Sequence, residues 1–86
     1  MFLSIRVIDS EATCCNIKRI LEERGITPKD VQKALRFDSV QAVYKWISPK
    51  TKTVPSLDSL VQLANFLDCE IEDILVMKEI NDDNEI

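Results

Sequence analysis

One helix in the middle of the chain has a start that the sequence marks clearly. Thr27 precedes Pro28, and this pair is typical of a helix start, because threonine caps helix N-termini and proline fits their first turn. Asp30 stands three residues after the cap, where its carboxylate can complete a capping box, and Ile26 is spaced to pack onto Val31 as a hydrophobic staple. A helix is therefore expected to begin at Pro28.

A tight turn is predicted after this helix. Its apolar stripe is expected to consist of Val31, Ala34 and Leu35. It should stop near Arg36, since residues 37–38 form a short corner and Ser39 can cap a further helix over 39–47. Residues 48–55 contain two prolines, two lysines and no helical periodicity, which predicts a solvated loop.

The helix expected over 39–47 divides its residues between two faces. At about 100° per residue, one side carries Val43, Trp46 and Ile47, and the other carries Gln41, Tyr44, Lys45 and Ser48. Because Trp46 shares the apolar side, we interpret it as a core anchor; a platform for stacking single-stranded bases is the alternative. The polar side is then free to contact a partner, and this layout can lay one short helix against DNA.

Three more helices complete an all-α fold, a five-helix bundle. The first is expected over 11–24, capped by Asp9 or Ser10 and ended by Gly25. Its predicted buried residues are Cys14, Ile17, Ile20 and Leu21. The fourth starts after Ser56 and repeats apolar residues at helical intervals, namely Leu57, Leu60, Val61, Leu63, Ala64 and Leu67. A short fifth helix is expected over 71–75.

The two ends of the chain are expected to differ from the bundle. Residues 4–8 are rich in β-branched side chains, and residues 75–80 could continue a helix or form a strand, so a two-stranded ribbon within one chain or between two is predicted. The expected organisation is an N-terminal extension over 1–9, the helical domain over 10–78 and an acidic mobile tail over 79–86.

Composition narrows the classes of function. The chain has 86 residues, three cysteines and no histidine, which favours neither a disulfide framework nor a zinc site and fits a reducing cytoplasm. No apolar run reaches the ~18 residues that span a bilayer, so no membrane association is expected. Without a glycine-rich phosphate loop or a recognisable nucleophile and base, we predict no enzyme, no cofactor and no metal.

The net charge of −4 conceals a division along the chain. Residues 1–53 hold ten Lys and Arg against six Asp and Glu, whereas residues 54–86 hold one lysine against nine acids. A basic surface on an acidic protein is therefore expected, with an acidic carboxyl-terminal half that could bind a basic protein partner or simply be solvated.

Three segments together resemble one known family. They are Asn16 to Thr27, Gln41 to Trp46 and Pro55 to Leu60, within a match covering roughly Asn16 to Val76. The resemblance is to the phage-repressor or Cro-type helix-turn-helix family, also called the xenobiotic-response-element family of bacterial regulators. It implies a lambda-repressor-like bundle, usually dimeric on DNA, whose third helix enters the major groove.

The resemblance also implies which residues meet DNA. By position, Ser39, Val40, Gln41, Tyr44 and Lys45 would contact DNA, and Thr27, Pro28 and Lys50 would lie near the phosphates. Lys52 is a further candidate for a phosphate contact, because it lies in the same loop as Lys50. Gln41 is the sharpest candidate for a base contact, because an amide can pair with adenine; a solvated helix glutamine is the alternative. Tyr44 and the lysines could equally be ordinary surface residues.

The sequence departs from the family pattern around the turn. Pro28 stands where the family commonly has glutamine, Gln32 replaces a small residue and Arg36 replaces the usual turn glycine. The turn over 37–39 is one residue longer than the common one.

The leading hypothesis is a bacterial or phage-like transcriptional regulator, such as a repressor, that binds duplex DNA sequence-specifically as a homodimer on a partly palindromic operator. The alternative is a protein-interaction module, antitoxin-like or an anti-repressor, that uses the same fold without strong DNA binding.

Overall fold

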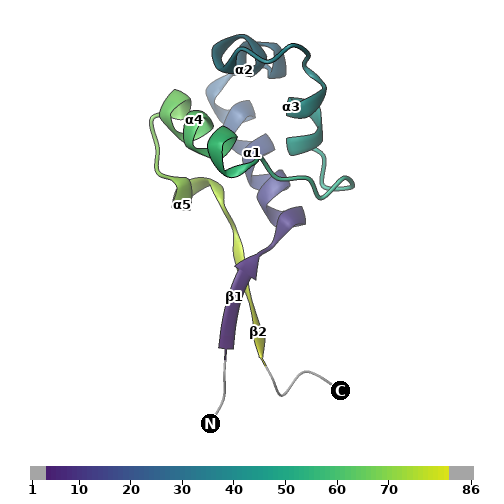
Figure 1. Cartoon of the computed structure of the whole chain (residues 1–86), viewed down its shortest axis with the longest axis vertical. Coiled ribbons are helices and arrows are strands. Elements are labelled where there is room, and N and C mark those ends of the chain that lie inside the picture. The colour runs from purple at the N-terminus through teal and green to yellow at the C-terminus, as the bar shows by residue number, and fades with distance from the viewer. Residues whose placement is uncertain (1–3, 82–86) are drawn as a thin grey trace.

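The computed structural model describes residues 4–81, which form a helical body with a two-stranded ribbon extending from one end (Figure 1). The elements in chain order are β1 (Ser4–Ile8), α1 (Ser10–Arg24), α2 (Pro28–Leu35), α3 (Gln41–Trp46), α4 (Leu57–Leu67), α5 (Ile71–Ile74) and β2 (Met77–Asn81). All five predicted helices are present. An all-α description is incomplete, however, because the two strands pair.

The ends of α1 and α4 follow the residues that cap them. The Asp9 carboxylate accepts a hydrogen bond from the Ala12 N–H at 3.0 Å, and the Ser56 hydroxyl accepts one from the Ser59 N–H at 3.2 Å. Gly25 ends α1 with a φ of +67°, a left-handed backbone that glycine adopts without steric cost. Asp9, not Ser10, is therefore the cap of α1.

The predicted start of α2 is confirmed in detail. Thr27 and Asp30 form a complete capping box: the Asp30 N–H donates to the Thr27 hydroxyl at 3.2 Å, and the Thr27 N–H donates to the Asp30 carboxylate at 2.9 Å. The Thr27 N–H, together with the Thr27 hydroxyl, holds the pKa of the Asp30 carboxyl below its usual range.

The core lies between α1, α4 and the α2–α3 pair. Its buried members are Ile17, Ile20, Leu21, Val31, Leu35, Val43, Trp46, Leu60, Leu63, Ala64, Leu67 and Ile74. Trp46 packs edge-on against Phe37, with ring centroids 5.5 Å apart and planes at 79°. The expectation that Trp46 anchors the core is confirmed.

Three positions of the predicted apolar stripes are wrong. Ala34 is exposed, and on α4 Leu57 and Val61 are 76% and 41% exposed. Leu57 is the first residue of α4, and it shares a helix face with Val61 one turn later. That face points away from the core, which α4 contacts through Leu60, Leu63, Ala64 and Leu67.

The predicted ribbon forms within one chain. β1 and β2 pair antiparallel, with Ile5 opposite Ile80, Arg6 opposite Glu79 and Ile8 opposite Met77. Since β2 runs to Asn81, the expectation of a tail beginning at residue 79 is wrong; residues 82–86 lie outside the described part. Residues 4–8 likewise form a strand of the ribbon rather than a mere extension.

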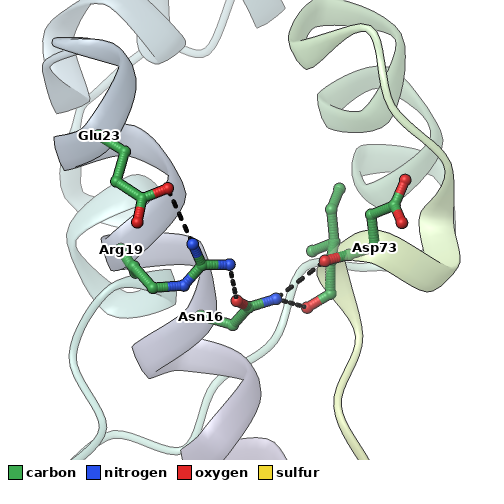
Figure 2. A network of polar contacts seen from close by, with 5 residues as sticks. Asn16, Arg19, Glu23 and Asp73 are labelled. Atoms are coloured by element: carbon green, nitrogen blue, oxygen red, sulfur yellow. Dashed lines mark hydrogen bonds and ion pairs between the residues drawn. The ribbon is translucent and has the colours of Figure 1, made fainter.

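Polar side chains on one face of α1 join the base of the ribbon to the bundle. Thr13 is fully buried; its hydroxyl accepts from the Val76 N–H at 3.0 Å and lies 3.3 Å from the Val76 carbonyl oxygen. One turn further on, the Asn16 amide donates at 2.9 Å to two carbonyls, those of Asp73 and Ile74 (Figure 2). The ribbon is thus fixed to α1 where it leaves the helical body.

A chain of contacts on α1 orients the Asn16 amide. Arg19 donates to the Asn16 side-chain oxygen at 2.7 Å and pairs with Glu23 at 2.8 Å (Figure 2). Both charged side chains are more than half exposed, so this pair adds little stability by itself. The hydrogen bond from Arg19 occupies the Asn16 side-chain oxygen, so the NH2 end of the amide faces α5.

Candidate nucleic-acid interface

The turn between α2 and α3 is closed by two hydrogen bonds between the same two residues. The Phe37 N–H donates to the Gln32 carbonyl at 3.0 Å, and the Gln32 side-chain amide donates to the Phe37 carbonyl at 3.1 Å. Arg36, between them, has a φ of +60° in the left-handed region. The departure from the family pattern at Gln32 therefore has a structural role, since its side chain spans the turn.

Helix α3 begins later than predicted. It covers Gln41–Trp46, with Val40 as the residue before it, and not 39–47. Val40 adopts a helical backbone but has no side-chain acceptor, and the Ser39 hydroxyl reaches past it to accept from the Gln41 N–H at 3.3 Å. Ser39 thus stabilises the start of α3 from two residues away instead of occupying the cap position.

The two faces of α3 separate as predicted. Val43 is fully buried and Trp46 is 4% exposed, while Gln41 and Lys45 are exposed and Tyr44 is 49% exposed. Gln41, Tyr44 and Lys45 lie three and four residues apart, so they share one face of the helix. That face can contact another molecule without disturbing the core.

The remaining predicted site residues surround this face unevenly. Ser39 is exposed, whereas Val40 is half-buried and packs against the core. Thr27 is exposed at the start of α2, with its hydroxyl oxygen engaged in the capping box, and Pro28 is half-buried and has no N–H to donate. Thr27 therefore offers at most its hydroxyl proton to a phosphate.

Lys50 and Lys52 are both exposed in the loop that follows α3. Within residues 4–81 the one ion pair is Arg19 with Glu23, so no carboxylate neutralises either loop lysine there. Lys52 has a φ of +52°, a second left-handed backbone in this region.

Sequence reasoning missed a group of contacts that holds this loop to the end of α3. The Thr51 hydroxyl oxygen lies 2.7 Å from the Lys45 carbonyl oxygen and 2.9 Å from that of Ser48. The Cys14 thiol, from α1, donates to the Thr53 carbonyl at 3.3 Å. A threonine in a polar loop gives no sequence signal for such contacts, because they depend on where the chain returns.

The cysteines have different surroundings. Burial raises the pKa of the Cys14 thiol, and burial together with the nearby Asp73 carboxylate raises that of Cys69. Cys15 is exposed. The two raised pKa values make the thiols of Cys14 and Cys69 less reactive at neutral pH than an ordinary thiol.

Charge is distributed in favour of an anionic partner at α2 and α3. Residues 27–53 hold six basic residues, namely Lys29, Lys33, Arg36, Lys45, Lys50 and Lys52, and two acidic ones. All six are exposed. Helices α4 and α5 and their connection hold no basic residue and five acids, Asp58, Asp68, Glu70, Glu72 and Asp73.

The described residues form neither a metal site nor a membrane-spanning helix. Among residues 4–81, no group of three or more histidine, cysteine or acidic side chains could hold a metal ion. In the same part of the chain, no helix has the length and apolar character needed to cross a membrane.

A family model described as a Cro/C1-type helix-turn-helix DNA-binding domain matches residues 16–79. This range includes the later part of α1, all of α2 to α5 and the start of β2. Comparison with curated proteins and with solved structures found no match.

Proposed function

The chain belongs to the Cro/C1-type helix-turn-helix DNA-binding family, and from that premise we propose that it is a transcriptional regulator that recognises a specific double-stranded DNA sequence. The observation that carries this proposal is the division of α3. Val43 and Trp46 are buried, while the opposite face is exposed within the basic part of the chain. A short helix of this kind can enter the major groove.

In the proposed complex, the exposed face of α3 reads base edges. The Gln41 side-chain oxygen can accept a hydrogen bond from the adenine N6 amino group while its N–H donates to adenine N7, and this bidentate geometry distinguishes adenine from the other bases. Tyr44 and Lys45 lie on the same face, where a phenol can contact a thymine methyl group or a phosphate and an ammonium can neutralise one. Ser39 and Val40 would lie at the edge of the groove.

Phosphate contacts would hold α3 in register. Lys50 and Lys52 follow α3 in the chain and Thr27 stands at the start of α2, so candidate phosphate contacts come both before and after the groove-facing helix in the sequence. Pro28 can contribute only van der Waals contact at its position. We place DNA binding in the helical body, which lies within the predicted domain of residues 10–78, with the acidic helices α4 and α5 turned away from the DNA by charge repulsion.

We further propose that two copies bind one operator. The ribbon supports this, because it leaves the helical body (Figure 1) and exposes Ile5, Ile8, Met77 and Ile80 by 60%, 40%, 40% and 44%. An isolated two-stranded ribbon is marginal in water, and exposed strand edges readily pair with another chain. Sedimentation of the protein with the selected duplex should give two protomers per duplex, and one protomer would contradict the dimer.

Selection of bound fragments from random duplex DNA tests the main proposal. We expect a partly palindromic consensus, and saturable binding of that duplex that weakens as salt rises, because phosphate contacts release counterions. A scrambled duplex of equal length and composition is the control. Equal affinity for both duplexes would reject sequence-specific recognition, and co-purification of a basic protein without DNA binding would support a protein-interaction module instead.

A further inference from the structure

The loop over residues 48–55 has a defined conformation, although its composition predicts only a solvated connection. Thr51 is the residue that organises it. Its hydroxyl oxygen is within hydrogen-bond distance of the Lys45 and Ser48 carbonyl oxygens, and its one proton can serve either of them. The same oxygen accepts from the Thr53 N–H at 3.3 Å.

These contacts connect the loop to the helix that precedes it. Lys45 is in the last turn of α3, where its carbonyl accepts a long hydrogen bond of 3.4 Å from the Ser48 N–H and can also accept from a side chain. Thr51 uses this carbonyl, and the backbone N–H of Thr51 also donates to the Ser48 carbonyl at 3.1 Å. The loop is therefore folded back onto the end of α3.

A second set of contacts holds the far side of the loop. The Thr53 hydroxyl donates to the Thr51 carbonyl at 3.2 Å, and the Thr53 carbonyl accepts from the buried Cys14 thiol of α1. Lys52 lies between the two threonines with its left-handed backbone, which is unfavourable for a residue with a Cβ. Such a conformation persists where surrounding contacts fix the backbone, and here both neighbours of Lys52, Thr51 and Thr53, are fixed by hydrogen bonds.

We infer that Thr51 is a positioning residue for DNA binding, which presents Lys50 and Lys52 to the phosphate backbone beside the groove that α3 occupies. This inference rests on the proposed function. Both lysines are exposed and flank Thr51 directly, so the backbone that Thr51 fixes determines where their side chains begin. Without the hydroxyl, the backbone at Lys50 and Lys52 is no longer fixed in the free protein. Ordering the two lysines on DNA then costs more conformational entropy.

The experiment compares Thr51→Val, which keeps the shape but removes the hydroxyl, with Thr51→Ser, which keeps the hydroxyl. Binding of the full chain to the selected duplex is measured at several salt concentrations. We expect Thr51→Val to bind roughly threefold to tenfold more weakly, with a salt slope lower by about 1 to 2, as for lost phosphate contacts. Thr51→Ser should stay close to the wild type in both quantities.

A double-variant cycle separates positioning from general stability. In a Lys50→Gln, Lys52→Gln background the lysines are already absent, so adding Thr51→Val should cause little further loss of affinity. Circular dichroism at the binding temperature checks that each variant is folded. If Thr51→Val does not fold, Thr53→Val is measured in its place, because it removes the hydroxyl that bonds to the Thr51 carbonyl. It should lower both the affinity and the salt slope, as expected for Thr51→Val.

Two results would overturn the inference. One is wild-type affinity and salt slope in folded Thr51→Val; the other is an equal loss of affinity with and without the loop lysines. A wild-type chain that fails to prefer the selected duplex over the scrambled one would instead reject the proposed function, so the two failures are distinguishable.

Discussion

Gln32 and Phe37 exchange two hydrogen bonds across the turn between α2 and α3, one through the backbone N–H of Phe37 and one through the side-chain amide of Gln32. Phe37 in turn packs edge-on against Trp46 of α3. The turn thereby links the end of α2 to the buried side of the proposed recognition helix, and the angle between the two helices depends on it.

Replacing Gln32 with alanine should weaken this turn. The backbone bond remains, but the Phe37 carbonyl loses its side-chain donor, so we expect the free energy of unfolding to fall by about 1 kcal/mol. Urea unfolding measures it. Gln41→Ala is the matched control, since Gln41 is exposed on α3 and should change stability by less than about 0.5 kcal/mol. Equal effects of the two substitutions would contradict a role for Gln32 in the turn.

Gln41→Ala should alter sequence preference more than overall binding. If the amide pairs with an adenine, its loss removes about 1–3 kcal/mol of discrimination at one base pair and leaves the phosphate contacts in place. Affinities for duplexes substituted at each operator position measure this. Lys50→Gln is the contrasting variant, which should weaken binding to all duplexes alike. Unchanged preference at every position in Gln41→Ala would reject the base contact.

Arg36→Gly should stabilise the fold. Arg36 holds a left-handed backbone, which is unfavourable for a residue with a Cβ, and part of the relief is offset by the greater freedom of glycine in the unfolded chain. We expect a net gain of about 0.5–1 kcal/mol in the free energy of unfolding, measured by denaturant titration. Arg36→Ala removes the same charge but keeps the Cβ, so it should show no such gain. An equal gain in Arg36→Ala would mean that loss of the charge, and not relief of the left-handed backbone, stabilises the fold.

The contribution of Asp30 to stability should depend on pH. The folded-state pKa of Asp30 is lowered, first by the Thr27 N–H bond, so its stabilising effect is fully present above the unfolded pKa of about 3.9 and is lost as pH falls through the folded value. The stability difference between wild type and Asp30→Ala should therefore be larger at pH 7 than at pH 2–3. Asp38→Ala, in the turn, removes an equal charge outside the capping box and serves as the control. A difference independent of pH would contradict the assignment.

Local features were predictable from the sequence where the residues that determine them lie within one short segment. Thr27, Pro28 and Asp30 specify the start of α2 without help from the rest of the chain, and Gly25 ends α1 in the same way. The division of α3 into two faces was also predictable, because helical periodicity alone places Val43 and Trp46 on one side.

Features that depend on distant parts of the chain were not predictable. The apolar pattern of α4 could not show that Leu57 and Val61 face solvent, since this depends on where α2 and α5 pack against the helix. The link from Thr13 to Val76 and that from Cys14 to Thr53 each join residues far apart in sequence. The same holds for Thr51, whose partner becomes evident only when the loop is seen folded against α3.

Chemical-shift mapping of the folded protein on addition of the selected duplex tests most directly whether the exposed face of α3 meets DNA. We expect the largest changes at the backbone amides of residues 39–46 and at the side-chain amide of Gln41, with smaller changes at Lys50 and Lys52. The amides of α4 and α5 should change little. If the largest changes fall on α4 and α5, or if α3 shows none at saturating duplex, α3 is not the helix that contacts DNA.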